Sequence, residues 1–517
     1  MAPNPSPGTD DAAAPHARGW ILAALMCAML LAAMDTTIVS TAVPQIVGDL
    51  GGFAHFSWVF SIYLLAQTVT IPIYGKLADL VGRKPVLIAG TVIFLVGSAA
   101  CAASWDMLSL IAFRGLQGLG AGSIMATVST LAADLYPVHR RGAIQGWLSS
   151  VWGVAAIAGP LLGGTFADYL SWRWIFLVNL PIGVVALALI GAYLHEHFER
   201  RRPRIDVAGS GLVLLWVGAL MFALLQGGQA WPWLSALSLA AFGVAAIGAV
   251  ATVLVERRAA EPVMPPWLWR SRLLGASNLS MIGMGLVMMA PSTLLPTLLQ
   301  AVQGLGAVGA GLVLASMSIG WPLASALSGP AYMRFGFRDT ALAGGVLVVA
   351  SLLAFWALPA PAPVAAILAT QVALGAGFGL LSTPVLVGVQ SAVGWERRGV
   401  VTGANMFSRY LGQSLGAALV GAVFNTTLAE RLAAAPAGLG GRLPPRIDAV
   451  LDTLHAAATD AAVRAWLREA IDAATRQVFA AMLLPALVIV IVLLVAPRSF
   501  TLAGTHDAGP QGSRRRR

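Results

Sequence analysis

Apolar stretches of about 20 residues recur along this chain, separated by short polar segments. A helix needs about 20 apolar residues to cross the roughly 30 Å of hydrocarbon in a bilayer. The residues do not alternate between apolar and polar as the strands of a membrane barrel do. The pattern therefore predicts about fourteen membrane-spanning helices, near residues 20–43, 57–75, 86–104, 107–132, 143–165, 174–194, 210–226, 234–255, 274–300, 309–330, 339–358, 364–390, 400–424 and 478–497.

The composition agrees with this pattern. Of 517 residues, 58% are hydrophobic and only 10% are charged, against about 25% charged in soluble proteins. The net charge of +10 comes from basic residues in short loops, so we expect no nucleic-acid partner. Cys27 and Cys101 fall inside predicted spans, which argues against a disulfide or a metal site. We expect an all-α polytopic membrane protein.

The loops of one side carry almost all of the basic residues. They hold Arg18, Lys76, Arg83, Lys84, Arg140, Arg141, Arg200–Arg204, Arg257, Arg258, Arg270, Arg272, Arg334, Arg338, Arg397, Arg398 and Arg498, while the short loops opposite carry Arg173 alone. Basic loops stay in the cytoplasm, so we expect both termini there and a multi-pass protein of the cytoplasmic (inner) membrane. Residues 1–18 lack the basic start of a cleaved signal peptide.

The loop 425–476 is an exception, because its six arginines are placed outside by the span count. Loops of about this length escape the charge rule. Its apolar spacing predicts amphipathic helix. It is interpreted either as a gate or docking hairpin at the outer mouth or as a folded surface loop.

Similar motifs occur in the same order in the two halves of the chain. Arg140-Arg141-Gly142 with Gly146 returns as Arg397-Arg398-Gly399 with Gly403, and Gly75 with Gly82 returns as Gly329 with Gly336. Such repeats are typical of transporters that place substrate between two bundles. We expect an N-terminal tail (1–18), a six-helix bundle (19–194), two inserted helices with linkers (195–272), a second six-helix bundle including the outer loop (273–497) and a basic tail (498–517).

Three polar residues inside predicted spans are candidates for moving protons. Asp35 lies deep in the first span, and Arg114 and Gln117 lie in the fourth. A charge at this depth is costly unless it is paired or reaches water. We interpret the three as a proton-coupling site. The alternatives are an aspartate satisfied by neighbouring hydroxyl groups and an arginine that only holds backbone carbonyls.

Two further motifs predict regions that change conformation during transport. The loop Gly75–Lys84 combines glycines that permit a tight turn with Asp79, Arg83 and Lys84, which suit an ion-paired interface; the alternative is a loop that only fixes topology. The span 143–165 carries small residues and a proline, which allow close packing and a bend. We interpret these residues as a hinge and seal: Gly153, Gly159, Pro160, Gly163 and Gly164.

Together these motifs resemble the major facilitator superfamily, and within it the fourteen-span drug:proton antiporters of the EmrB/QacA type. The resemblance implies two six-helix halves plus two inserted spans. It implies that Gly75, Asp79, Gly82, Arg83 and Lys84, with Asp134, form a lock that holds the outward-facing state. It also implies proton coupling near Arg114 and export rather than import through the Gly-Pro run.

The predicted function is multidrug efflux, in which protons are exchanged for lipophilic, cationic or neutral small molecules. Met284, Met288, Gln300 and Trp321 are candidates for a drug-binding wall, with ordinary packing as the alternative. No phosphate-binding loop is present, so the proton-motive force is the expected drive, without a cofactor or a metal. Partners are protons, membrane lipids and the substrates, and a periplasmic adaptor stays open.

Three alternatives remain. A dedicated exporter of one metabolite or antibiotic would differ in substrate breadth, and a receptor would bind without flux. An intramembrane enzyme would need catalytic groups that converge inside the membrane, but all seven histidines lie in loops or tails. We therefore expect no enzyme activity.

Overall fold

The structure is a computed structural model that describes residues 15–51, 57–196, 206–227, 231–259, 261–436, 439, 443–444, 450–455 and 460–498. Most of the two predicted tails, the basic run Arg200–Arg204 and parts of the loop 425–476 lie outside the described residues.

The first half of the chain forms a helical bundle. Its elements are α1 (Pro15–Ile38), η2 (Val39–Ala42), α2 (Val43–Leu50), α3 (Ser57–Val81), α4 (Arg83–Ala102), α5 (Met107–Leu135), α6 (Val138–Tyr169), α7 (Trp174–Leu177) and α8 (Asn179–Tyr193). Gly82 separates α3 from α4 with a φ of 101°, a conformation that glycine adopts without steric cost. The chain therefore reverses there within one residue.

The second half forms another bundle. Its elements are α11 (Trp267–Arg270), α12 (Arg272–Ala301), α13 (Ala307–Phe335), α14 (Phe337–Trp356), α15 (Val364–Ser391), η4 (Trp395–Arg397), α16 (Arg398–Ala433), α17 (Val450–His455), α18 (Ala461–Ala481) and α19 (Leu483–Val495). Gly336 separates α13 from α14 with a φ of 90°, and so takes the place that Gly82 has in the first half.

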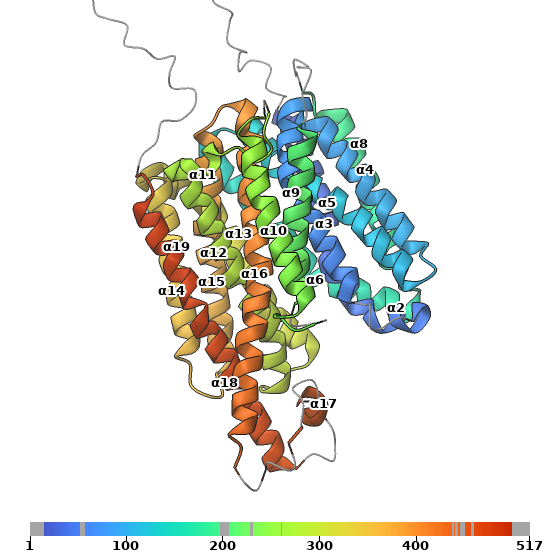
Figure 1. Cartoon of the computed structure of the whole chain (residues 1–517), viewed down its shortest axis with the longest axis vertical. Coiled ribbons are helices and arrows are strands. Elements are labelled where there is room, and N and C mark those ends of the chain that lie inside the picture. The colour runs from blue at the N-terminus through green and yellow to red at the C-terminus, as the bar shows by residue number, and fades with distance from the viewer. Residues whose placement is uncertain are drawn as a thin grey trace, which may run out of the picture.

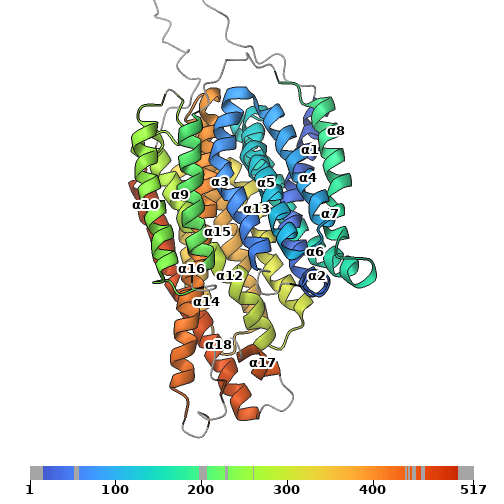
Figure 2. The same cartoon turned by 45° about the vertical axis from the view of Figure 1, so that its right-hand side comes forward.

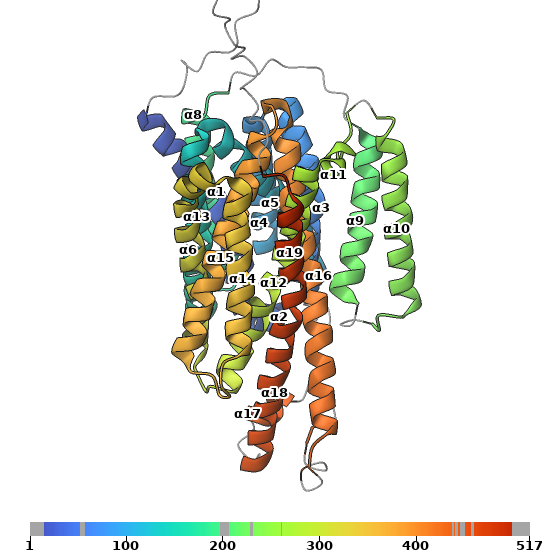
Figure 3. The same cartoon turned by 90° about the vertical axis from the view of Figure 1, so that its left-hand side faces the viewer.

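Between the halves, α9 (Val207–Gln226) and α10 (Ala236–Glu256) form a hairpin of two helices. The hairpin lies beside α3 and α16 at the edge of the molecule (Figures 2 and 3), and faces the viewer in Figure 1. Trp216 of α9 contacts Phe407 of α16 with ring centroids 6.3 Å apart, and Phe222 contacts Trp58 of α3. The inserted hairpin therefore touches one helix from each half.

Every predicted span lies on a helix, but the count of fourteen stays a prediction. Within the described part of the chain, eleven helices are long and apolar enough to cross a membrane. The helices α5, α9 and α16 are not among them. The apolar part of α9 has 17 residues, and α5 and α16 carry charged side chains inside the helix, including Arg114 and Arg409.

Within 425–476 the structure describes helix at 425–433, 450–455 and 461–476, with turn or irregular backbone at the other described residues. The last turns of α16, together with α17 and α18, project beyond the other helices (Figure 3). Leu428, Val450, Leu454, Leu467 and Ile471 are buried against one another there. The structure therefore gives this segment an apolar core of its own.

Candidate functional site

The three residues predicted to couple protons lie together. Asp35 of α1 is fully buried, and its Oδ2 lies 2.5 Å from Nη1 of Arg114 on α5. Gln117, one turn farther along α5, donates from Nε2 to Oδ1 of Asp35 at 2.8 Å. Arg114 Nη1 also donates to Gln117 Oε1 at 2.8 Å, and Arg114 Nε donates to the Val59 carbonyl at 3.2 Å. A buried ion pair is tolerated when further hydrogen bonds satisfy both partners.

A second set of side chains surrounds this pair. Ser98 Oγ accepts from Gln117 Nε2 at 3.2 Å and from Asn179 Nδ2 at 3.0 Å. The Tyr63 ring lies 4.2 Å from the Arg114 guanidinium carbon, and the Tyr63 hydroxyl is buried without a hydrogen-bond partner. The sequence reading assigned no role to these residues, although Asn179 is conspicuous as the one amide in an otherwise apolar helix.

The predicted hinge residues place α6 directly against the turn of α1 that follows Asp35. A Cβ atom on Gly159 would lie 2.1 Å from Thr37 Oγ1, and one on Gly163 would lie 2.1 Å from Thr41 Oγ1. Thr37 Oγ1 in turn donates to the Ala155 carbonyl of α6 at 2.9 Å. The turn of α1 beside Asp35 is therefore in direct contact with α6.

The other hinge residues have separate positions. Pro160 lies inside α6 next to Gly159. Gly153 approaches Ser318 of α13, in the other half of the molecule, whereas no atom lies within 4 Å of a Cβ placed on Gly164. The glycines thus divide into one that contacts the other half, two that contact α1 and one without a close neighbour.

We call the end of the bundle that carries the α3–α4 turn the lock end. Here both carboxylate oxygens of Asp79 accept hydrogen bonds, at 2.8 Å each, from the backbone amides of Gly399 and Val400 at the start of α16. Arg83 Nη2 donates to Asp79 Oδ1 at 2.7 Å. A helix N-terminus offers free amides and partial positive charge to an anion, so Asp79 joins the two halves.

Asp134 of α5 also lies in this cluster. Its Oδ2 lies 3.1 Å from Arg83 Nε, and its Oδ1 accepts from Arg398 Nη1 at 2.8 Å. The Arg83 guanidinium carbon lies 3.4 Å from the centroid of the Trp395 ring. Ion pairs in such a water-poor setting are much stronger than pairs in bulk water.

Glycines allow close contact between helices of opposite halves at the lock end. A Cβ on Gly75 of α3 would lie 2.5 Å from the Gly399 carbonyl oxygen of α16, and one on Gly142 of α6 would lie 2.6 Å from the Gly329 amide nitrogen of α13. Gly75 and Gly329 are counterparts in the repeated motifs, as are Gly142 and Gly399. Each of the two contacts therefore joins a repeated motif of the first half to the counterpart of the other repeated motif in the second half.

Two acidic residues at this end were missed by the sequence reading. Glu196 accepts from the backbone amides of Arg83 and Lys84 at 2.9 Å each, and Lys84 Nζ donates to the Leu194 carbonyl at 2.6 Å. Glu261 forms an ion pair with Lys76. Both glutamates lie in the segments that flank the α9–α10 hairpin, so these segments are tied to the α3–α4 turn.

Three of the four candidates for a drug-binding wall, Met284, Met288 and Trp321, belong to or pack against one apolar core of the second half. Met284 is fully buried in the core of the second half, and Gln300 is exposed near the far end of α12. Met288 is partly buried and accepts from Gln413 Nε2 at its sulfur, at 3.5 Å. Trp321 is also partly buried and packs on Phe378.

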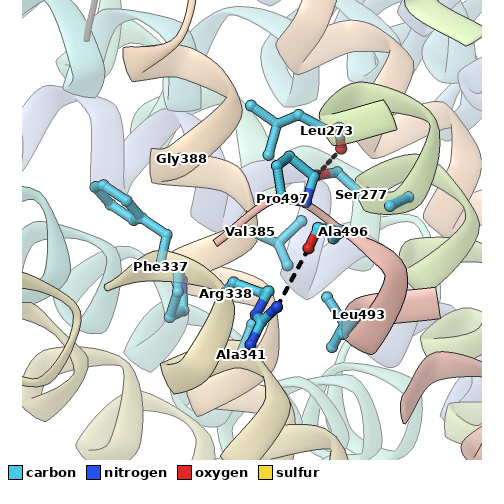
Figure 4. A pocket seen from close by; sticks show the side chains of 12 residues that line it. Leu273, Ser277, Phe337, Arg338, Ala341, Val385, Gly388, Leu493, Ala496 and Pro497 are labelled. Carbon is cyan, nitrogen blue, oxygen red and sulfur yellow. Dashed lines mark hydrogen bonds between the residues drawn. The ribbon is translucent and has the colours of Figure 1, made fainter. Parts of the chain in front are cut away.

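A small pocket lies at the lock end of the second half, between α12, α14, α15 and α19 (Figure 4). Its residues include Leu273, Phe337 and Leu493, and Arg338 donates across its edge to the Ala496 carbonyl. Its volume is about 20 Å³, about the space of one or two water molecules. Drug-sized ligands need about 300 Å³ or more, so this pocket is no substrate site.

One further charged residue was overlooked. Arg409 lies one third of the way along α16 and is partly exposed. Among the residues described, no group of three acidic, histidine or cysteine side chains is arranged to hold a metal ion.

Comparison with known proteins places this geometry in a family. A model described as "Major Facilitator Superfamily" matches residues 25–417. The chain is 33% identical to the "Multidrug transporter protein MdtP" of Bacillus subtilis, over 86% of this chain and 81% of that protein. It is 34% identical to "Multidrug resistance protein 3" of the same organism, over 82% of each chain.

A solved structure shares the fold. The human organic anion transporter MFSD10 superposes with a TM-score of 0.60 at 14% identity, over 93% of this chain and 100% of that one. At this identity the likeness concerns the fold alone. The matched family model, the two relatives and the shared helical fold show that this chain belongs to the Major Facilitator Superfamily of membrane transporters.

Proposed function

We propose that this protein is a proton-coupled antiporter that exports lipophilic small molecules across the cytoplasmic membrane, with both termini in the cytoplasm. The observation that carries the proposal is the fully buried Asp35 carboxylate, paired with Arg114 and Gln117. An ionisable group inside a membrane is by default a functional site. The multidrug transporters among its relatives favour export as the direction.

Protonation of Asp35 is the proposed trigger. Adding a proton removes the carboxylate charge and weakens its hold on Arg114 and Gln117. Thr37 lies two residues beyond Asp35 and contacts α6 at Ala155 and Gly159. The freed turn of α1 would therefore shift against α6, whose lock-end part contacts α13 of the other half.

The lock end is assigned to the cytoplasmic side in this proposal, because its loops carry the basic residues. Contacts of Asp79 with α16 and of Gly142 with α13 hold the halves together at that end. We interpret this arrangement as the outward-facing state. Proton entry from outside then opens the lock, and proton release to the cytoplasm resets it. The electrical drive is about 2.3 kcal/mol per charge for each 100 mV.

The test is efflux of lipophilic probes from proteoliposomes under an imposed proton gradient. We expect Asp35→Asn to abolish gradient-driven efflux, since the amide cannot exchange protons. The matched control is Asp106→Asn, at the exposed N-cap of α5. The backbone amide of Ser109 holds the pKa of Asp106 below its usual range, so Asp106 stays charged near neutral pH, and asparagine preserves the cap.

Three results are decisive. Efflux that a protonophore abolishes, and that Asp35→Asn loses while Asp106→Asn keeps it, supports the proposal. Undiminished efflux in Asp35→Asn would place coupling elsewhere. Binding of probes without any flux in the wild type would favour a receptor.

A further inference from the structure

Arg409 lies well inside α16, about one third of the way along the helix. It stands eleven residues beyond Arg398, where α16 begins, and a helix rises about 1.5 Å per residue. Its Cα is therefore about 16 Å from the lock end, in a hydrocarbon layer of about 30 Å. Arginine at this depth is costly and nearly always faces the interior of a bundle.

The packing of α16 shows where position 409 faces. Gly412 contacts α12, since a Cβ there would lie 2.1 Å from the Ile282 carbonyl oxygen. Tyr410 faces α3, because its hydroxyl accepts from Gln67 Nε2 at 3.3 Å. A helix turns by about 100° per residue, which puts position 409 between these two contact faces. Arg409 thus points into the space between the two halves.

Other positions on α16 support this direction. Phe407 contacts Trp216 of the inserted hairpin, so the face toward α9 lies on another side of the helix. Thr402 lies two turns below Arg409 and accepts from Gln390 Nε2 of α15 at 2.9 Å. Contact between α15 and α16 therefore lies on the lock-end side of Arg409.

The Arg409 guanidinium has no hydrogen-bond or ion-pair partner in the described part of the chain, and its Nε is buried without an acceptor. Its nearest aromatic ring is that of its neighbour Tyr410, 5.2 Å away. A guanidinium offers five N–H donors in a rigid fork that matches a carboxylate. A structural arginine would hold carbonyl oxygens, as Arg114 holds that of Val59.

We propose that Arg409 is the binding subsite for an anionic group of the exported molecule. The substrates are then lipophilic compounds that carry a carboxylate or a sulfonate, which replaces the cationic or neutral class expected from the sequence. Met406 and Met288 lie near this position on α16 and α12 and are partly buried, and methionine adapts to varied apolar shapes. This inference rests on the proposed function and adds the charge class of its substrate.

The anion subsite and the proton site lie in different halves but are connected. Gln67 contacts Tyr410 beside Arg409, and Tyr63, one turn away on α3, stacks on Arg114. One turn of α3 therefore separates the contact beside Arg409 from the contact with Arg114. An anion at Arg409 leaves Asp35 free to take a proton.

The charge of the substrate has a measurable consequence. Exchange of one proton for one monovalent anion moves two positive charges inward in each cycle. Exchange of one proton for one monovalent cation moves none. Export of a carboxylate therefore accelerates when the membrane potential is made negative inside the cell, whereas export of a cation in this ratio does not.

The experiment compares wild type, Arg409→Gln, Arg409→Lys and the control Arg431→Gln, an exposed arginine on the same helix. The probes are a lipophilic carboxylate dye, its methyl ester and the cation ethidium. Proteoliposome efflux is measured under a proton gradient with and without a potassium–valinomycin potential. Equilibrium binding of each probe to purified protein is measured in parallel by fluorescence anisotropy, and thermal unfolding of each variant controls for folding.

We expect Arg409→Gln to weaken binding and to slow efflux of the carboxylate dye at least tenfold, and to change ester and ethidium less than twofold. Arg409→Lys should fall in between, and Arg431→Gln should behave as wild type. Equal losses for all probes, or tighter binding of ethidium than of the carboxylate dye by wild type, would overturn the inference.

Failure of the proposed function gives a different result. If no probe shows proton-driven flux, the proposed antiport function is excluded. The binding measurement still decides the role of Arg409, because selective binding of the carboxylate dye needs no transport.

Discussion

Two arginines inside the helical bundle have opposite surroundings. Arg114 is fully buried and bonds to Asp35, Gln117 and the Val59 carbonyl. Arg409 is partly exposed and has no hydrogen-bond or ion-pair partner in the described structure. A buried donor without a partner costs about 1–3 kcal/mol. The difference indicates that the first half satisfies its buried arginine internally, whereas the second half leaves one arginine without a hydrogen-bond or ion-pair partner among the described residues.

The largest expected effect is on the buried pair of Asp35 and Arg114. Arg114→Gln leaves Asp35 buried without its cation, and breaking a buried pair in this way costs about 3–5 kcal/mol. We expect a clear fall in the thermal unfolding temperature of the purified protein and loss of proton-driven efflux. Differential scanning fluorimetry and proteoliposome efflux measure the two.

A double variant sharpens this result. Asp35→Asn together with Arg114→Gln removes both charges, so it should be more stable than Arg114→Gln alone. Equal or lower stability of the double variant would mean that Arg114 contributes mainly through its contacts with Val59 and Tyr63.

A smaller effect is expected at the connection between the two regions. Tyr410→Phe removes the hydrogen bond from Gln67, and one neutral hydrogen bond contributes about 0.5–1.5 kcal/mol. We expect a modest loss of stability and a few-fold fall in the proton dependence of efflux, read from its pH profile. Unchanged proton dependence would show that the two regions act independently of this contact.

The smallest stability effect is expected at Arg409. Arg409→Gln removes a charge without breaking a bond or ion pair in the described structure, so the unfolding temperature should stay the same or rise slightly. Thermal unfolding beside Arg114→Gln gives the direct contrast. A loss as large as that of Arg114→Gln would show that Arg409 is a structural residue, and the comparison would fail.

The sequence alone determined where helices and rare charges lie. Apolar length predicts the spans because hydrocarbon excludes unpaired backbone groups, and each predicted span lies on a helix. Asp35 and Arg114 stood out because a charge inside an apolar stretch is costly. The sequence alone does not show that Asp35 and Arg114 are in contact, since 79 residues separate them.

Only the tertiary structure decided which groups meet and which way they face. Arg398 reaches Asp134 across 264 residues, and Glu196 caps α4 from a distant linker. Met284 and Met288 lie one turn apart, yet only Met284 is fully buried. Arg409 is ordinary in the sequence and becomes distinctive when α12 and α3 flank it, because partners and free space are properties of packing rather than of local pattern.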